Sequence, residues 1–185
     1  MRALSAVVVL CLVTAGCGGA PDTGPVGASS AVSTPPSGGL TPTDVAFVEL
    51  AIPQNESALA AAELTLKRSG SNPELVALAE RVDSGYRVEL DRLNGVLTAA
   101  GLTRSDQHDG HDMPGMITAL ELAALDQAQG AAFDERMREA FRAHLRESLT
   151  VAQAELSSGT AKSVLELGSD IERTRTELLG RLGAP

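Results

Sequence analysis

Residues 43–70, TDVAFVELAIPQNESALAAAELTLKRSG, determine the fold class. Apolar side chains recur every three or four residues along this stretch: Val45, Val48, Ile52, Leu59, Ala62 and Leu66. This spacing places them on one face of an α-helix and is typical of a helix in a bundle. Thr43 is suited to begin the helix and Gly70 to end it.

The same periodicity predicts three more long helices and one short one. The second covers about residues 72–100, the short one 118–128, the fourth about 133–156 and the fifth 164–182. Only a few residues join the first two helices, which makes them antiparallel neighbours. The chain has one Tyr, three Phe and no Trp, and its Ala and Leu suit narrow helix interfaces better than sheets.

The chain also repeats itself. Residues 47–66 align with 137–156 at an offset of 90, and residues 78–93 align with 167–182 at an offset of 89. Two related helical hairpins predict an all-α, pseudo-symmetric four-helix bundle, with a polar loop and a short helix between the hairpins. We therefore expect the bundle domain to cover residues 43–185.

The first 16 residues have the features of a secretory signal, because one cation at Arg2 precedes an apolar run too short to span a bilayer. The run ends at Thr14-Ala15-Gly16-Cys17, which looks like the site at which bacterial lipoproteins are acylated and cut. We expect Cys17 to carry the lipid and Cys11 to leave with the signal. An ordinary signal peptide with a chance cysteine is the alternative.

Residues 17–42 are predicted to be a disordered tether, since they contain Gly, Pro, Ser, Thr and Ala with few large apolar side chains. After removal of residues 1–16, 14 basic and 24 acidic side chains remain, a net charge of −10. This balance argues against nucleic acid as a partner. We expect an extracytoplasmic domain held at a membrane by its lipid.

The strongest chemical signal is a His/Met loop, His108-x-x-His111-x-Met113-x-x-Met116, in the polar segment between the hairpins. Thioether and imidazole ligands suit copper, so the four side chains are predicted to bind a copper ion. Two alternatives remain open. The methionines could instead cover the bundle as apolar side chains while the histidines are solvated, or the histidines could bind zinc with an aspartate.

Three polar side chains fall on the apolar faces of predicted helices: Asn55, Glu89 and His144. A buried polar group needs a partner, so we expect these residues to meet, with Tyr86 close by. They form either the remnant of a metal site or a hydrogen-bonded structural network. We expect no enzymatic activity, because no Glu lies three residues before a His, as a di-iron bundle requires, and the sequence contains no nucleophile elbow, phosphate-binding loop or HExxH motif.

The second hairpin resembles the bacterial family called domain of unknown function 305, whose architecture is similar to ferritin-like bundles. The matching positions are Met113, Pro114, Gly115, Met116, Leu120, Leu122, Leu125, Gly130, Phe133 and Asp134. The resemblance implies the handling of copper or other soft metals outside the cytoplasm. The family's two His-His pairs fall on Gln54-Asn55 and on His144-Leu145, and its Gln-x-x-Glu-Ile on Tyr86, Glu89 and Leu90 and on Arg175, Leu178 and Leu179.

The expected function is therefore copper binding by a membrane-anchored lipoprotein, for metal buffering or tolerance. The alternative is a protein-interaction module of the cell envelope whose metal site has decayed. A second copy of the chain or another envelope protein would then be its partner.

Overall fold

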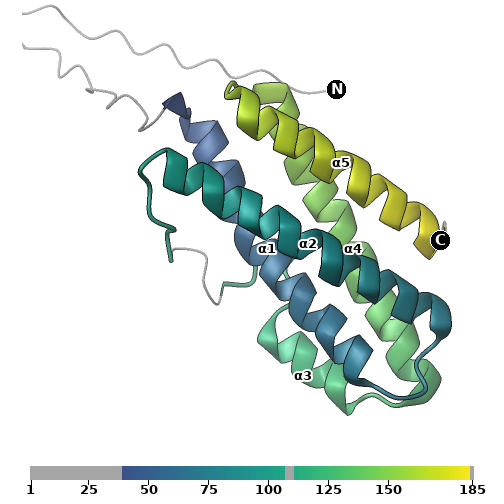
Figure 1. The fold of residues 1–185 in the computed structure, drawn as a ribbon. Helices are drawn as coiled ribbons and strands as arrows, with labels where there is room; N and C mark the ends of the chain where they lie inside the picture. The colour runs from purple at the N-terminus through teal and green to yellow at the C-terminus, as the bar shows by residue number, and fades with distance from the viewer. Residues whose placement is uncertain (1–38, 107–110, 184–185) are drawn as a thin grey trace, which may run out of the picture. The chain divides into compact units, whose positions relative to one another are not determined.

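The computed structural model describes residues 39–106 and 111–183 and confirms the predicted all-α fold. Its helices are α1 (Pro42–Lys67), α2 (Pro73–Ala99), α3 (Ala119–Gln127), α4 (Gly130–Ser158) and α5 (Lys162–Leu182). Two long hairpins, α1–α2 and α4–α5, form the four-helix bundle, and α3 precedes the second hairpin (Figure 1). The predicted signal, Cys17 and most of the predicted tether lie outside the described residues.

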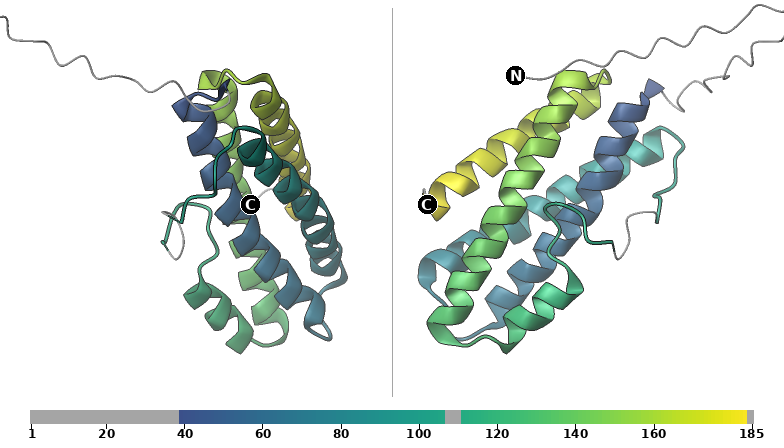
Figure 2. Two further views of the ribbon diagram at one scale, coloured as in Figure 1. Left: turned by 60° about the vertical axis from the view of Figure 1, so that its left-hand side comes forward. Right: turned by 180° about the vertical axis from the view of Figure 1, so that it is seen from behind.

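The four long helices close into a ring in which α1 packs on α2 and α4, while α5 packs on α4 and α2. The short α3 lies against α1 and α4 near one end of the bundle (Figure 2). The core consists of two apolar clusters, one including Leu75, Phe133 and Phe141 and the other including Phe47, Leu97 and Leu167. A layer of polar side chains lies between these clusters along the helices.

Two aspartates show that the hairpins are related in space as well as in sequence. Asp44 of α1 accepts hydrogen bonds from the backbone amides of Thr160 and Ala161, both at 3.0 Å, at the start of α5. Its counterpart 90 residues later, Asp134 of α4, accepts from the backbone amide of Asn72 at the start of α2. An aspartate of each hairpin therefore binds the turn that joins the two helices of the other hairpin.

The domain begins slightly earlier than the sequence pattern predicts. Thr41, rather than Thr43, caps α1, because its hydroxyl accepts from the Asp44 amide and the Asp44 carboxylate accepts from the Thr41 amide. This reciprocal pair is a capping box, and Pro42 follows at the position where a helix tolerates proline. Leu40 is already buried in the core, so residues 40–42 belong to the domain and not to the tether.

None of the helices within residues 39–106 and 111–183 combines the length and the apolar character that a membrane span requires.

Candidate functional site

A layer of buried polar side chains crosses the middle of the bundle, and all four long helices contribute to it. Asn55 comes from α1, Tyr86 and Glu89 from α2, His144 and Ser148 from α4, and Arg175 from α5. Each of them is at most 6% exposed. A polar group buried so deeply is costly unless it is hydrogen-bonded, so its partners determine what the layer can do.

Arg175 is the centre of this layer, and all three of its guanidinium nitrogens donate hydrogen bonds. Nη1 and Nη2 bind the two carboxylate oxygens of Glu89 at 2.9 and 2.7 Å. Nη2 also donates to Asn55 Oδ1 at 2.8 Å, and Nε donates to Ser148 Oγ at 3.0 Å. Asn55 completes the group by donating to Glu89 at 3.0 Å. The result is a bidentate, fully buried ion pair with satisfied neighbours.

Tyr86 and His144 extend the layer beyond the hydrogen bonds of Arg175. Arg175 Cζ lies 3.8 Å from the centroid of the Tyr86 ring, which is a cation–π contact. The Tyr86 hydroxyl is 3.0 Å from His144 Nε2, and His144 Nδ1 is 2.7 Å from the carbonyl oxygen of Gly115. Because a carbonyl can only accept, Nδ1 carries the proton and Nε2 accepts from the tyrosine.

Burial and the charge of Arg175 lower the pKa of His144 to about 3, although its hydrogen bond to Gly115 opposes this shift. The imidazole is therefore neutral at physiological pH. Burial likewise raises the pKa of Tyr86, so its hydroxyl keeps its proton. Arg175 and Glu89 are thus the charged groups at the centre of the layer, and they compensate each other.

The polar layer also holds the loop that carries the predicted copper ligands. Met113, Pro114, Gly115 and Met116 form a tight turn, closed by a 3.0 Å hydrogen bond from the Met116 amide to the Met113 carbonyl. Gly115 has a φ of +81°, the left-handed value that the third position of a type II turn requires. Two successive carbonyls are bound by the bundle: Gln54 donates to Pro114 at 2.9 Å, and His144 donates to Gly115.

The structure places three of the four predicted copper ligands, while His108 lies outside the described residues. His111 is exposed, and Met113 and Met116 are half-buried. His111 and Met116 line one open groove of about 610 Å³ beside Pro53, together with Asp112. Within residues 39–106 and 111–183, no three His, Cys, Asp or Glu side chains are grouped so that they could hold a metal ion.

The three residues predicted to meet in the interior, Asn55, Glu89 and His144, do not all contact one another. Asn55 and Glu89 are joined directly, whereas His144 bonds to Tyr86 and to the loop. From the sequence, Arg175 was interpreted only as a position where a ligand of the family is absent, and its place at the centre of the layer was not predicted. A signal was available, since Arg175 lies on the same helical stripe as Ile171 and Leu178, which are buried.

The bundle interior does not fit a metal ion. The guanidinium of Arg175 already supplies a positive charge to Glu89 and donates to the side-chain amide oxygen of Asn55. The one imidazole lone pair, on His144 Nε2, accepts from Tyr86. An ion placed among these groups would meet a buried cation and would break a satisfied network.

Two repeated helical hairpins around a buried polar layer, with a Met-Pro-Gly-Met turn docked on it, define the class of protein. The family model described as Domain of unknown function (DUF305) matches residues 44–183, and the chain belongs to this family. Comparison with the curated proteins finds no match.

Solved structures of the same fold include several relatives of low sequence identity. A DUF305 fragment from Deinococcus radiodurans is 19% identical, with a TM-score of 0.69 over 77% of this chain and 94% of that one. A DUF305 protein from Streptomyces coelicolor is 16% identical, with a TM-score of 0.68 over 76% and 89%. CopM in its Cu(II)-bound form is 21% identical, with a TM-score of 0.66 over 75% and 92%.

Proposed function

We propose that this protein binds copper outside the cytoplasm through the His/Met loop, as a membrane-anchored lipoprotein that buffers the metal. The observation that carries the proposal is the groove beside Pro53, where His111 and Met116 lie together with the carboxylate of Asp112. Imidazole and thioether suit Cu(I), and a carboxylate adds affinity for Cu(II).

The docked turn supports the same proposal. The hydrogen bond between Met113 and Met116 brings the ends of the turn together, and the bonds from Gln54 and His144 fix the turn on the bundle. Ligands that are held in place before the metal arrives lose less conformational entropy on binding. CopM, which shares the fold, has been solved with Cu(I) and with Cu(II) bound.

The anchor is a separate part of the proposal. Cys17 would carry the lipid, and the chain between it and the first described residue, Gly39, would be the spacer to the membrane. Labelling with a palmitate analogue in the producing bacterium would test this, with Cys17→Ser as the comparison. Labelling that persists in Cys17→Ser would rule out lipidation at this cysteine.

Copper binding is tested by titrating the purified protein with Cu(I) in the presence of a competing chelator. The test variant replaces His108, His111, Met113 and Met116 by Ala. The matched control is Met137→Leu, which changes a methionine buried in α4 and conserves volume. We expect one copper per protein in the wild type and in Met137→Leu, and a loss of at least tenfold in affinity in the loop variant.

Two other outcomes of the titration would contradict this proposal. Unchanged affinity in the loop variant would place the copper away from the loop. An absence of competitive binding in the wild type would remove copper from the function and would favour the alternative, a protein-interaction module of the cell envelope.

A further inference from the structure

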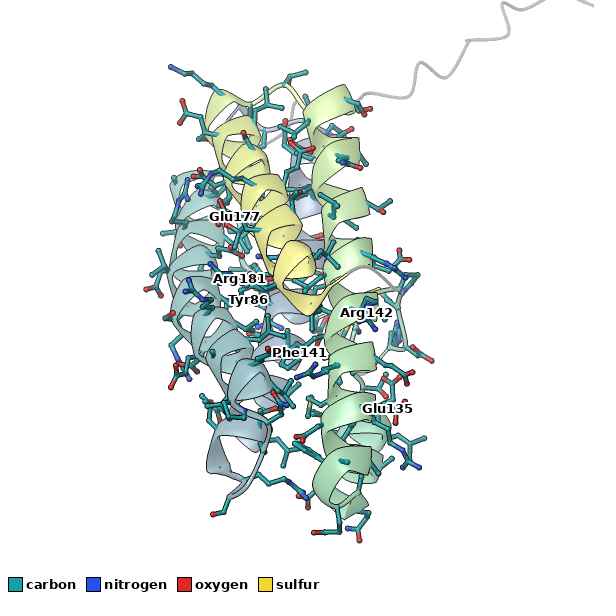
Figure 3. All side chains as sticks on the ribbon, turned by 90° about the vertical axis from the view of Figure 1, so that its right-hand side faces the viewer. Tyr86, Glu135, Phe141, Arg142, Glu177 and Arg181 are labelled. Atoms are coloured by element: carbon teal, nitrogen blue, oxygen red, sulfur yellow. The ribbon has the colours of Figure 1, made fainter. Side chains whose placement is uncertain are left out.

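Helix α5 ends before its neighbours α2 and α4 do, and a cleft lies beside its last turn. α5 has 21 residues and α4 has 29, a difference of about 12 Å at 1.5 Å per residue. Figure 3 shows α5 ending part of the way along α2 and α4, with Arg181 in its last turn. The cleft at this place has a volume of about 350 Å³ and is lined by α2, α4 and the end of α5.

The cleft combines an apolar floor with a cationic rim. Leu75 and Leu78 of α2 and Leu182 of α5 line it, and Arg81, Arg138 and Arg181 stand around it, one from each helix. Arg138 is already engaged, because it donates to Asn72 at 2.8 Å and contacts Glu74, the one carboxylate of the lining, at 3.4 Å. Arg81 and Arg181 are the two remaining arginines of the rim.

The guanidinium groups of Arg81 and Arg181 have no hydrogen bond or ion pair with any residue in 39–106 or 111–183. The chain has a net charge of −9, and most other arginines of the described segments bind a carboxylate. The pairs include Arg68–Asp126, Arg87–Asp83, Arg92–Asp170, Arg104–Glu56 and Arg173–Asp170. Two free guanidinium groups from different helices therefore lie beside one apolar cleft.

We propose that this cleft binds a small amphipathic anion, a carboxylate on a short hydrocarbon chain. The planar fork of an arginine matches a carboxylate in two parallel hydrogen bonds. The leucines offer the hydrocarbon chain an apolar surface away from water. The volume lies at the lower end of the range for small-molecule sites, so the ligand is a short chain and not a full phospholipid.

The test is a titration of the purified protein with octanoate, followed by two-dimensional NMR and calorimetry. Acetate, which has the same head but no tail, and 1-octanol, which has the same tail but no charge, are the comparison ligands. We expect saturable one-to-one binding of octanoate, with shifted amide signals at Leu75, Leu78 and Leu182. Acetate and octanol should bind at least tenfold more weakly.

The double variant Arg81→Ala/Arg181→Ala should weaken octanoate binding at least tenfold. Its matched control is Arg136→Ala/Arg146→Ala, which removes the same charge from two other arginines that are unpaired within the described residues and do not line the cleft. Equal weakening by both variants would reduce the effect to net charge and overturn the proposal. Equal affinity for acetate, or no saturable binding of octanoate, would overturn it as well.

Discussion

Tyr86 and Arg175 occupy equivalent positions in the two hairpins, 89 residues apart in the chain, and they stack on each other at the centre of the bundle. One hairpin supplies the aromatic ring and the other supplies the cation. A strict repeat would place two rings or two cations there, and two buried cations would repel each other strongly. The charge of Arg175 is compensated by Glu89, whose equivalent position in the second hairpin is Leu178. Differences between the hairpins at these two pairs of positions therefore let the bundle close around a charge that is compensated from within.

Replacing Arg175 by Met should destabilise the domain by about 3–5 kcal/mol, because Glu89 would be left buried without its cation. Urea-induced unfolding monitored by circular dichroism measures this change. The double variant Arg175→Met/Glu89→Leu removes both charges and should recover part of the loss. A double variant less stable than Arg175→Met would show that the two residues do not act as a pair.

His144 should make the domain less stable in acid. Its folded-state pKa of about 3 lies below the ordinary value of 6.5, so between these pH values the unfolded chain binds one more proton at this site. Lowering the pH through this range therefore favours unfolding, by up to about 1.4 kcal/mol per pH unit. His144→Gln should lack this contribution, and its stability relative to the wild type should rise as the pH falls.

The measurement is a series of urea unfolding curves between pH 3.5 and 7.5. His111→Gln, which changes an exposed histidine of the loop, is the control substitution. A stability difference between the wild type and His144→Gln that stays constant over the series would contradict the prediction.

Glu155 should make the domain less stable as the pH rises, which is opposite to the effect of His144. Burial is the main cause that raises its pKa from 4.5 to about 7, and the negative charge of the nearby Asp44 carboxylate raises it further. No described residue donates a hydrogen bond to its buried oxygens. The folded state therefore keeps a proton that the unfolded state releases above pH 4.5, and stability is lost as the pH rises towards 7.

Glu155→Gln removes this titration, so the variant should gain stability relative to the wild type between pH 4.5 and 7. Because Glu155 and His144 act in opposite directions between pH 4.5 and 6.5, the wild type alone conceals both effects. The two single variants separate them. A Glu155→Gln difference that is independent of pH would show that Glu155 is ionised in the folded protein.

Gly115→Ala should destabilise the domain by about 1–3 kcal/mol and weaken copper binding by the loop. A side chain is strained at a φ of +81°, and the new Cβ would lie 2.7 Å from Cβ of Glu147. Gly95→Ala in α2 is the matched control, because no atom lies within 4 Å of the added Cβ. It should stabilise the helix by about 0.5–1 kcal/mol. Thermal unfolding and the copper titration measure both effects.

The helical periodicity predicted the long helices, the short helix and the paired hairpins, because each apolar stripe repeats over many turns and tertiary packing follows it. It placed the start of the first helix two residues late, because the reciprocal bonds between Thr41 and Asp44 depend on local geometry that apolar spacing does not report. The docking of Gly115 on His144 is a contact between residues 29 apart, and no periodic pattern encodes it.

For the interior site, the sequence predicted which residues are buried better than it predicted how they interact. Asn55 and Glu89 were conspicuous because polar residues interrupt an apolar stripe. Arg175 was not, since an arginine at a stripe position usually extends to solvent with its charged end. Only the packing of α5 against α2 shows that its guanidinium stays inside and meets Glu89.

The exchanged contacts of Asp44 and Asp134 have an evolutionary consequence. Because each aspartate binds the turn of the opposite hairpin, one hairpin alone would leave both its own aspartate and its own turn without a partner. Two identical copies of an ancestral hairpin, assembled as a homodimer, would satisfy both. The present chain has the contact pattern of such a dimer joined into one polypeptide, and its two halves differ where one carries the arginine and the other the glutamate that neutralise each other.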